Sequence, residues 1–378
     1  MDNLTDISRK MYIKAYNIQS VPAAVIMLRE CGSFRTLGDI LRGRITSDQP
    51  KSVLVDGLCY NHPDASRDSI DKKVRNWLNG RTQTVAKRDA FELAQILKLD
   101  LEQTDLFLKQ VTGEGIHWRD PSEIVWGYSI AQGLSYSDTI RLLRKASGFG
   151  ADGSAANMTS YTEEVFQKVR PLLDLPEDAF ISGLTAMNSS FGAFHNTAHR
   201  LFIQFLEILE GGDPGDFIDD GPKMTMRYIL EHYLYRTQVP VVKRESQKAS
   251  AGFNALQRSV RANWPDEQTL SKMKNREMDV SRKVLMMLFL ATDGGEPDDD
   301  TDFDEWDEEP PSRDEVFQGV YTRMNRMLQA CGFQQLDPRS PFDWIILFSI
   351  ALEVLWDSDL RMQEILREIF PGGTELQD

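Results

Sequence analysis

The chain has 378 residues, 41% of them hydrophobic, and a formal net charge of −15 at pH 7. This length and composition are typical of a globular protein of two or three domains. No run approaches the roughly eighteen apolar residues of a membrane span, and the N-terminus lacks the apolar core of a signal peptide. The three cysteines, Cys31, Cys59 and Cys331, are too far apart for a disulfide framework or a zinc motif. We therefore expect a cytoplasmic protein with no cofactor and no membrane partner.

Positive charge is concentrated in two islands. Residues 67–88 contain seven basic and two acidic residues, and residues 243–283 contain ten basic and five acidic residues. The net charge of −15, taken alone, argues against nucleic acid as a partner. An acidic surface that repels DNA everywhere except at two basic islands would orient docking as well as weaken it. The alternative without a binding function is that these lysines and arginines form an ordinary solvated surface.

Apolar residues recur every three or four positions along almost the whole chain, which predicts an all-α, multi-helical fold. Helices are expected within 1–45, and residues 46–53, TSDQPKSV, are expected to form a loop. Further helices are expected over 100–111 and 124–131 and after residue 138. The Gly- and Ser-rich residues 147–160 are the most plausible linker, and a helical middle block follows over 161–235.

The stretch Asp71–Leu97 combines helical period, turn chemistry and positive charge. Val74, Trp77 and Leu78 share one face of a helix. The pair Asn79-Gly80 tolerates positive φ and so predicts the end of that helix. A second amphipathic helix follows, with apolar residues at Phe91, Leu93, Ala94, Ile96 and Leu97.

These residues carry a family resemblance. The pattern V-x-x-W-L-N-G-R, a short polar linker and then R-x-x-F-x-L-A-x-x-L resembles the λ-repressor and Cro type of helix-turn-helix over about residues 50–99. In that family the helix ending at Asn-Gly lies in the major groove, and the next linker touches phosphates. The resemblance implies that three residues face base edges: Asp71, Lys72 and Asn76. It implies that five meet phosphates: Lys73, Asn79, Arg81, Lys87 and Arg88. The preceding turn, expected over 59–66, is longer than the family's usual turn.

A similar arrangement returns later in the chain, which indicates a diverged internal duplication. At an offset of 195 residues, the second copy near 256–290 matches the first at Arg81 with Arg276, Val85 with Val280 and Lys87 with Arg282. At an offset of 220, the matches are Arg119 with Arg339, Pro121 with Pro341 and Glu123 with Asp343. The second copy suggests a second DNA patch, formed by Lys272, Lys274, Arg276, Arg282 and Lys283.

The difference between the two offsets corresponds to an acidic insertion over about 293–314. This stretch is rich in Asp, Glu, Gly and Pro and has little to bury, so it is expected to be disordered. The simpler interpretation is a solvated linker. The alternative interpretation is that the acidic segment mimics a nucleic acid, folds back on a basic island and inhibits it.

Other motifs favour no enzyme. His195 and His199 have the i, i+4 spacing of a metal pair on a helix, but no third ligand accompanies them, and a packed helix is the preferred interpretation. Phosphate-loop, nucleophile-elbow and zinc-protease motifs do not occur. Arg119 and Arg339 each precede a proline-led helix start, where pairing with a nearby acid is preferred over a phosphate ligand.

Together these patterns predict three blocks: 1–150 with the helix-turn-helix, a helical middle block over 151–223, and a related unit over 224–378. The leading hypothesis is a regulator that binds double-stranded DNA, of the kind carried by mobile or phage-derived elements. The alternative is a helical scaffold that binds another protein and retains a vestigial helix-turn-helix. A homodimer is an open alternative to a monomer.

Overall fold

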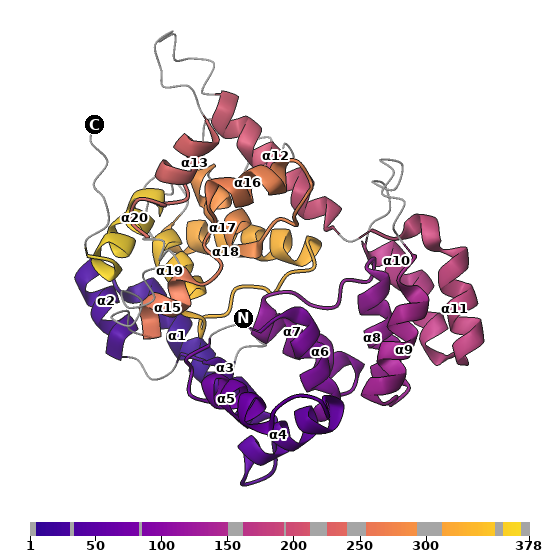
Figure 1. Ribbon diagram of the computed structural model, residues 1–378. Helices are drawn as coiled ribbons and strands as arrows, with labels where there is room; N and C mark the ends of the chain where they lie inside the picture. Colours follow the sequence, from indigo (N-terminus) through magenta and orange to yellow (C-terminus); the bar gives the residue numbers. More distant parts are fainter. Residues whose placement is uncertain are drawn as a thin grey trace. The chain divides into compact units, whose positions relative to one another are not determined.

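The computed structural model describes residues 5–30, 34–82, 85–149, 162–192, 194–211, 225–239, 255–292, 312–351 and 358–371. Throughout these ranges the regular secondary structure is helical, and an isolated antiparallel bridge joins Glu114 to Phe333 (Figure 1). The expected all-α fold is therefore confirmed. No helix in the same ranges is both long and apolar enough to span a membrane. Most of the expected linker, 150–160, and most of the acidic insertion, 293–311, lie outside the described residues.

The described residues divide into two compact units. Unit 1 comprises those within 1–34, 198–330 and 335–378, and unit 2 comprises those within 35–197 and 331–334. This division differs from the three blocks expected along the sequence. The reason is that the first two helices pack against the last two, so segments at opposite ends of the chain share one core.

Unit 1 contains the two N-terminal helices, α12 and the helices that follow it. Their bounds are α1 Asp6–Asn17, α2 Val21–Glu30, α12 Asn196–Gly211, α13 Met226–His232, α15 Ala255–Arg261, α16 Glu267–Lys274, α17 Arg282–Ala291, α18 Arg313–Ala330, α19 Pro341–Ile350 and α20 Ser358–Ile369. The core is centred on α19, where every residue from Phe342 to Ile350 is buried. Trp344 donates a hydrogen bond from Nε1 to the Met11 carbonyl at 3.0 Å, which ties α19 to α1.

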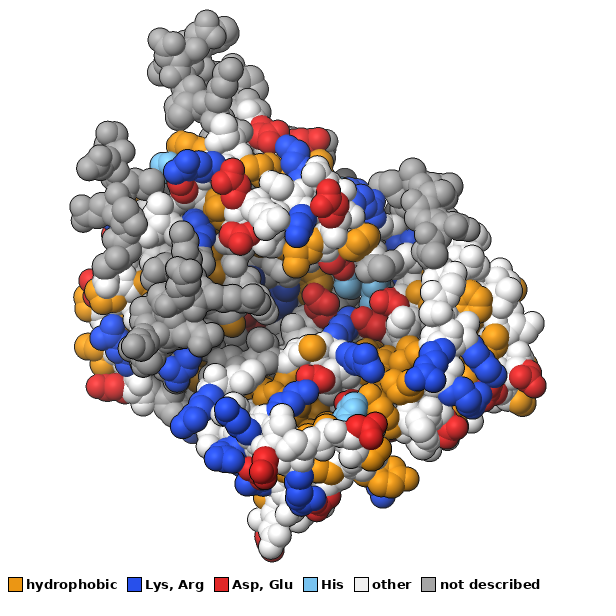
Figure 2. Space-filling model, in the orientation of Figure 1, with side chains coloured by type: hydrophobic (Ala, Val, Ile, Leu, Met, Phe, Trp, Pro, Cys, Tyr) orange, Lys and Arg blue, Asp and Glu red, His pale blue; other side chains and the backbone are white. Residues whose placement is uncertain are grey.

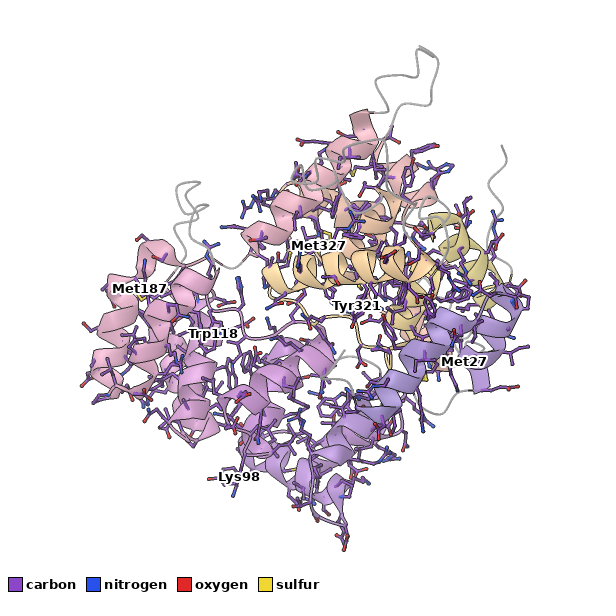
Figure 3. All side chains as sticks on the ribbon, turned by 180° about the vertical axis from the view of Figure 1, so that it is seen from behind. Met27, Lys98, Trp118, Met187, Tyr321 and Met327 are labelled. Atoms are coloured by element: carbon purple, nitrogen blue, oxygen red, sulfur yellow. The ribbon has the colours of Figure 1, made fainter. Side chains whose placement is uncertain are left out.

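Unit 2 is built from helices that follow one another along the chain. Their bounds are α3 Leu37–Gly43, α4 Pro50–Asn61, α5 Arg67–Leu78, α6 Lys87–Ile96, α7 Leu101–Thr112, α8 Pro121–Ala131, α9 Tyr136–Ala146, α10 Thr162–Val169 and α11 Glu177–Ala186, with 3-10 turns η2 Arg170–Asp174 and η3 Asn188–Ser190. Side chains of α3–α7 form one apolar cluster, and those of α8–α11 form most of a second. Trp118, which precedes α8, packs against both clusters (Figure 3).

Two expected boundaries around α4 were wrong. The stretch 46–53 is not all loop, because α4 begins at Pro50, where a missing N–H costs nothing at a first helical position. The turn expected over 59–66 is shorter, because α4 continues to Asn61 and α5 starts at Arg67. The connection between them is therefore His62–Ser66.

Candidate nucleic-acid interface

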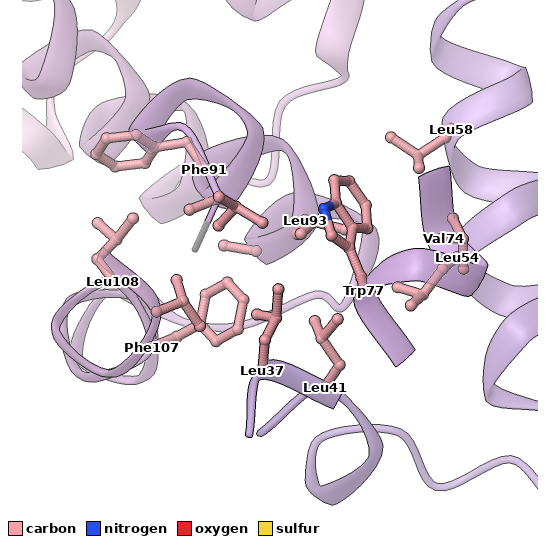
Figure 4. Close-up of a cluster of buried hydrophobic side chains, with 14 of the residues drawn as sticks. Leu37, Leu41, Leu54, Leu58, Val74, Trp77, Phe91, Leu93, Phe107 and Leu108 are labelled. Carbon is pink, nitrogen blue, oxygen red and sulfur yellow. The ribbon is translucent and has the colours of Figure 1, made fainter. Parts of the chain in front are cut away.

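Helix α5 has one buried and one basic face. Ile70, Val74, Trp77 and Leu78 are buried in the α3–α7 cluster. Figure 4 shows Val74 and Trp77 of this set among leucines from α3 and α4 and Leu93 of α6. Burying these apolar side chains fixes the rotation of α5 about its axis, so its charged residues must face solvent.

The C-terminal end of α5 is held by α3. Gly38 lies so close that a Cβ there would come 2.3 Å from the Leu78 carbonyl oxygen. The same carbonyl accepts a hydrogen bond from the Arg42 guanidinium at 2.5 Å. Only glycine permits this approach, and the arginine satisfies a carbonyl that the helix end leaves without an intrahelical donor.

The turn after α5 forms as the Asn-Gly pair predicts. Gly80 adopts φ 64°, in the left-handed region. The amides of Arg81 and Thr82 both donate to the Asn76 carbonyl, at 3.0 and 3.2 Å. The Arg81 side chain is exposed directly beyond the end of α5, which is where the resemblance requires a phosphate ligand.

Among the three predicted base-reading residues, only Lys72 is fully exposed. Asn76 is half-buried. The Asp71 carboxylate is held by Lys51 at 2.6 Å and by Arg75 at 2.7 Å. Hydrogen bonds from Lys51 and then Arg75 lower the pKa of Asp71 below its ordinary value. Both oxygens of the Asp71 carboxylate are therefore used in ion pairs with neighbouring side chains, Lys51 and Arg75.

One predicted phosphate ligand, Lys73, pairs with an aspartate. Lys73 sits 2.9 Å from Asp89 and also lies over the Trp77 ring, 5.0 Å from its centroid. In Figure 2 blue and red side chains are interspersed over the region where Figure 1 places α4 and α5. Exposed ion pairs of this kind contribute about 0–1 kcal/mol, so a phosphate can replace an aspartate at low energetic cost. Lys72 and Arg81 make no ion pair with any residue in the described ranges, and the uncharged Asn79 is exposed.

Lys87 and Arg88 begin α6 but point to different surroundings. The Lys87 amine lies 2.8 Å from Glu123 and 3.5 Å from Glu114. Burial alone would lower the pKa of Lys87, but these two carboxylates outweigh it and raise the pKa above its ordinary value. Arg88 is exposed, with its guanidinium 3.5 Å from the Tyr136 hydroxyl. The structure therefore uses Lys87 as an internal ion-pair partner and leaves Arg88 at the surface.

The five residues of the expected second patch do not form one basic face. Lys272 and Lys274 are exposed, and Lys274 pairs with Glu210 at 3.1 Å, while Arg276 is half-buried. Arg282 makes two bonds to the Asp343 carboxylate, at 2.6 and 2.8 Å, in a largely buried pair.

Lys283 also turns inward. Its amine donates to the carbonyls of Val260 and Ala262, at 2.7 and 2.5 Å, and lies 4.5 Å from the centre of the Phe342 ring. Burial lowers the pKa of Lys283 to about 7. The sequence predicted too large a basic patch, because the side chains of Arg282 and Lys283 make their contacts inside unit 1 rather than at its surface.

The histidines are arranged differently from their sequence spacing. His195 precedes α12, so it does not share a helix face with His199. Instead His195 stacks on His117, with ring centroids 4.0 Å apart. Burial and the neighbouring His195 lower the pKa of His117 well below its usual range. Nothing in the sequence signals this pairing, and no cluster of three metal ligands occurs among the described residues.

Comparison of the chain with protein-family models, with curated proteins and with solved structures gave no match.

Proposed function

We propose that the protein binds double-stranded DNA through α5 and the turn that follows it, and that this binding serves regulation. The observation that carries the proposal is the division of α5 into a packed apolar face and an exposed face bearing Lys72, Lys73 and Arg75, next to the exposed Arg81. In this role Lys72 and Asn76 meet base edges. Phosphates are met by Lys73, Asn79, Arg81 and Arg88.

Two residues that the resemblance placed on DNA take supporting roles in the proposal. Asp71 orients Lys51 and Arg75 through its two ion pairs. Lys87 holds α6 to the start of α8 through Glu123. Neither side chain then contributes a free charge to the nucleic acid.

The test is a mobility shift with genomic DNA fragments at low and moderate salt. Lys72→Glu/Lys73→Glu should abolish binding by wild-type protein, since it places two negative charges on the proposed contact face. The matched control is Arg9→Glu/Lys10→Glu, which makes the same charge change at two adjacent exposed residues of α1. The control should bind within about twofold of wild type at moderate salt, where a remote charge is screened.

Equal loss of binding in both variants would show a general charge effect rather than a site on α5. Absence of DNA binding by wild type at every salt concentration would exclude the proposal. The chain would then be a helical scaffold for another protein, the alternative that the sequence left open.

We propose further that α16–α19 is a diverged second copy of α5–α8. The turns after α5 and α16 support this, because the amides of Glu277 and Met278 both donate to the Lys272 carbonyl, at 2.8 and 3.2 Å. That pattern repeats the bonds made to Asn76, but one residue out of the register expected from the sequence, so that Arg276 is equivalent to Gly80 and not to Arg81. The residue after each helix cap also has positive φ, 64° at Gly80 and 57° at Arg276.

Side-chain contacts further along the two segments support the same proposal. Three contacts in unit 2 have counterparts in unit 1 at the expected offsets. The ion pair of Lys87 with Glu123 corresponds to that of Arg282 with Asp343. The bond from the His117 amide to Glu123 corresponds to that from the Asp337 amide to Asp343, and the bond from the Ile116 amide to Asp105 corresponds to that from the Leu336 amide to Asn325. An acid at the third position of one helix thus receives a cation from the start of another in both units. Such contacts between different segments do not follow from helical periodicity alone.

Helix α16 and its turn lack positive charge at the positions equivalent to Lys72 and Arg81, although Lys272 and Lys274 are exposed at the end of the helix. Matching the two turns places Gln268 where α5 has Lys72, and Glu277 where the turn has Arg81. Both Gln268 of α16 and Glu277 of the following turn are exposed. The proposed DNA contact therefore belongs to unit 2 alone.

A further inference from the structure

A carboxylate lies buried where α4 ends. Glu92, on α6, is 3% exposed within a helix whose neighbouring buried residues are apolar. The Asn61 side-chain amide donates to Glu92 Oε1 at 2.9 Å. The His62 ring nitrogen Nε2 lies 2.9 Å from Oε1 and 3.1 Å from Oε2. A buried carboxylate is costly unless polar partners satisfy it, and here both partners come from the last residue of α4 and the residue after it.

His62 is also connected, through Tyr136, to the exposed Arg88. The His62 ring packs edge-on against Tyr136, with centroids 5.1 Å apart. The Tyr136 hydroxyl lies 3.5 Å from the Arg88 guanidinium. One chain of contacts therefore runs from Glu92 through His62 and Tyr136 to a proposed phosphate ligand.

The connection from α4 to α5 needs such an anchor. It spans five residues, His62–Ser66, whereas a helix-turn-helix usually turns in three or four. The longer connection leaves more backbone freedom between the two helices. The one backbone hydrogen bond within it runs from the Ala65 amide to the His62 carbonyl, at 3.0 Å, and His62 is also the residue that Glu92 holds.

We propose that Glu92 is a positioning residue for the DNA interface, acting through Asn61 and His62 to fix the entry of the chain into α5, an inference that rests on the proposed function. Glu92 does not touch the nucleic acid. Its carboxylate holds the end of α4 against α6, so that Lys72 on α5 and Arg88 on α6 keep one mutual spacing. Phosphates lie at fixed intervals on a duplex, so ligands on two helices bind together only if that spacing is kept.

The test uses Glu92→Gln, which keeps the shape of the side chain and removes its charge. The matched control is Glu177→Gln, the same substitution in a carboxylate of unit 2 that pairs with Arg141 and Lys145 on α9. Two quantities are measured on each folded protein: DNA affinity as a function of salt, and amide hydrogen exchange over residues 62–70. Glu92→Gln should weaken binding about tenfold. It should also make the slope of log affinity against log salt concentration shallower by about 0.9, the value for one phosphate contact.

Exchange at Ala65 and Ile70 should become roughly tenfold faster in Glu92→Gln. Glu177→Gln should change neither quantity. His62→Gln, altered at a part-exposed side chain that folding tolerates, should reproduce both effects, and the double variant should be no worse than either single one because the two residues act as one unit.

The outcomes separate the two proposals. If wild type does not bind DNA, the proposed function is wrong, and the exchange data still decide whether Glu92 fixes the α4–α5 connection. If wild type binds and Glu92→Gln behaves like Glu177→Gln in affinity, slope and exchange, Glu92 is not a positioning residue. A loss of affinity with an unchanged salt slope and unchanged exchange also overturns the inference.

Discussion

Lys87 and Arg88 are adjacent in sequence, and both begin α6, yet their charges serve different purposes. Lys87 lies between Glu114 and Glu123 in a mostly buried setting. Arg88 is exposed beside Tyr136. A cation contributes to DNA binding through the counterions that it releases from phosphate, and one already neutralised by two carboxylates has little to contribute.

This contrast gives a prediction that separates stability from binding. Lys87→Met should lower the free energy of unfolding by about 3–5 kcal/mol, because it leaves two carboxylates without their cation. Its DNA affinity, measured well below the melting temperature, should stay within twofold of wild type. Arg88→Ala should do the reverse, with stability nearly unchanged and the log–log salt slope lowered by roughly 0.9. Denaturant unfolding and salt-dependent mobility shifts supply the two measurements.

Lys283 gives a prediction about pH. Burial lowers its pKa to about 7 in the folded chain, whereas the unfolded lysine has a pKa near about 10.4. Between these values the unfolded state binds more protons, so the free energy of unfolding should rise with pH, by at most about 1.4 kcal/mol per pH unit. Below pH 7 the lysine is protonated in both states, and this dependence disappears.

The measurement compares Lys283→Met with Lys272→Met, a change at an exposed lysine. Urea unfolding at several pH values from 6 to 10 should show the rise in wild type and in Lys272→Met. The rise should be reduced in Lys283→Met. Identical pH curves for all three proteins would mean that Lys283 keeps its proton when folded.

At the scale of single elements, the turn after α5 is tested by its glycine. Gly80 has φ 64°, and an L-residue in that region costs about 1–2 kcal/mol. Gly80→Ala should therefore destabilise unit 2 by about that amount and weaken DNA binding by moving Arg81. Gly43→Ala is the control, because a Cβ at Gly43 meets nothing within 4 Å and alanine favours the helix by up to about 1 kcal/mol. Thermal unfolding of the two variants should shift in opposite directions.

Helical periodicity predicted the elements better than their partners. Apolar spacing located α5 and α6, and Asn79-Gly80 located the turn between them, because both signals act within a few residues. Pro50 was misassigned to a loop since its neighbours are polar, although proline suits a first helical position.

The roles of Lys87, Arg282 and Lys283 could not be predicted, because each depends on which distant helix supplies a carboxylate or a carbonyl. The role of Glu92 could not be predicted either, because it is a single acidic residue within an otherwise apolar helical pattern. What the sequence did contain was the alignment of Glu123 with Asp343. The sequence aligned Lys87 with Arg282 as well, but it gave no sign that each cation pairs with the acid of its own unit.

At the scale of the whole molecule, the proposal that only one of two related copies binds DNA gives a gain-of-function prediction. Gln268→Lys/Glu277→Arg places on α16 the charges found at Lys72 and Arg81. If α16 is a diverged reading helix, the log–log salt slope should become steeper by up to about 2. The control, Asn17→Lys/Glu364→Arg, makes the same change in net charge at exposed residues of other helices in unit 1. An equal change of slope in both variants would argue against the proposed equivalence of α16 and α5.

The packing of α1 against α19 also sets an order of events during synthesis. The hydrogen bond from Trp344 to Met11 joins residues 333 positions apart. At roughly 5–20 residues per second, a ribosome needs about 15–70 s to make the intervening chain. During that time α1 has left the ribosome before α19 exists, and its Met11 and Tyr12 have no native partner, while most of unit 2 can already pack. Helix α1 is thus made long before α19, the helix against which it packs, and its apolar face stays without that partner during most of the synthesis of the intervening chain.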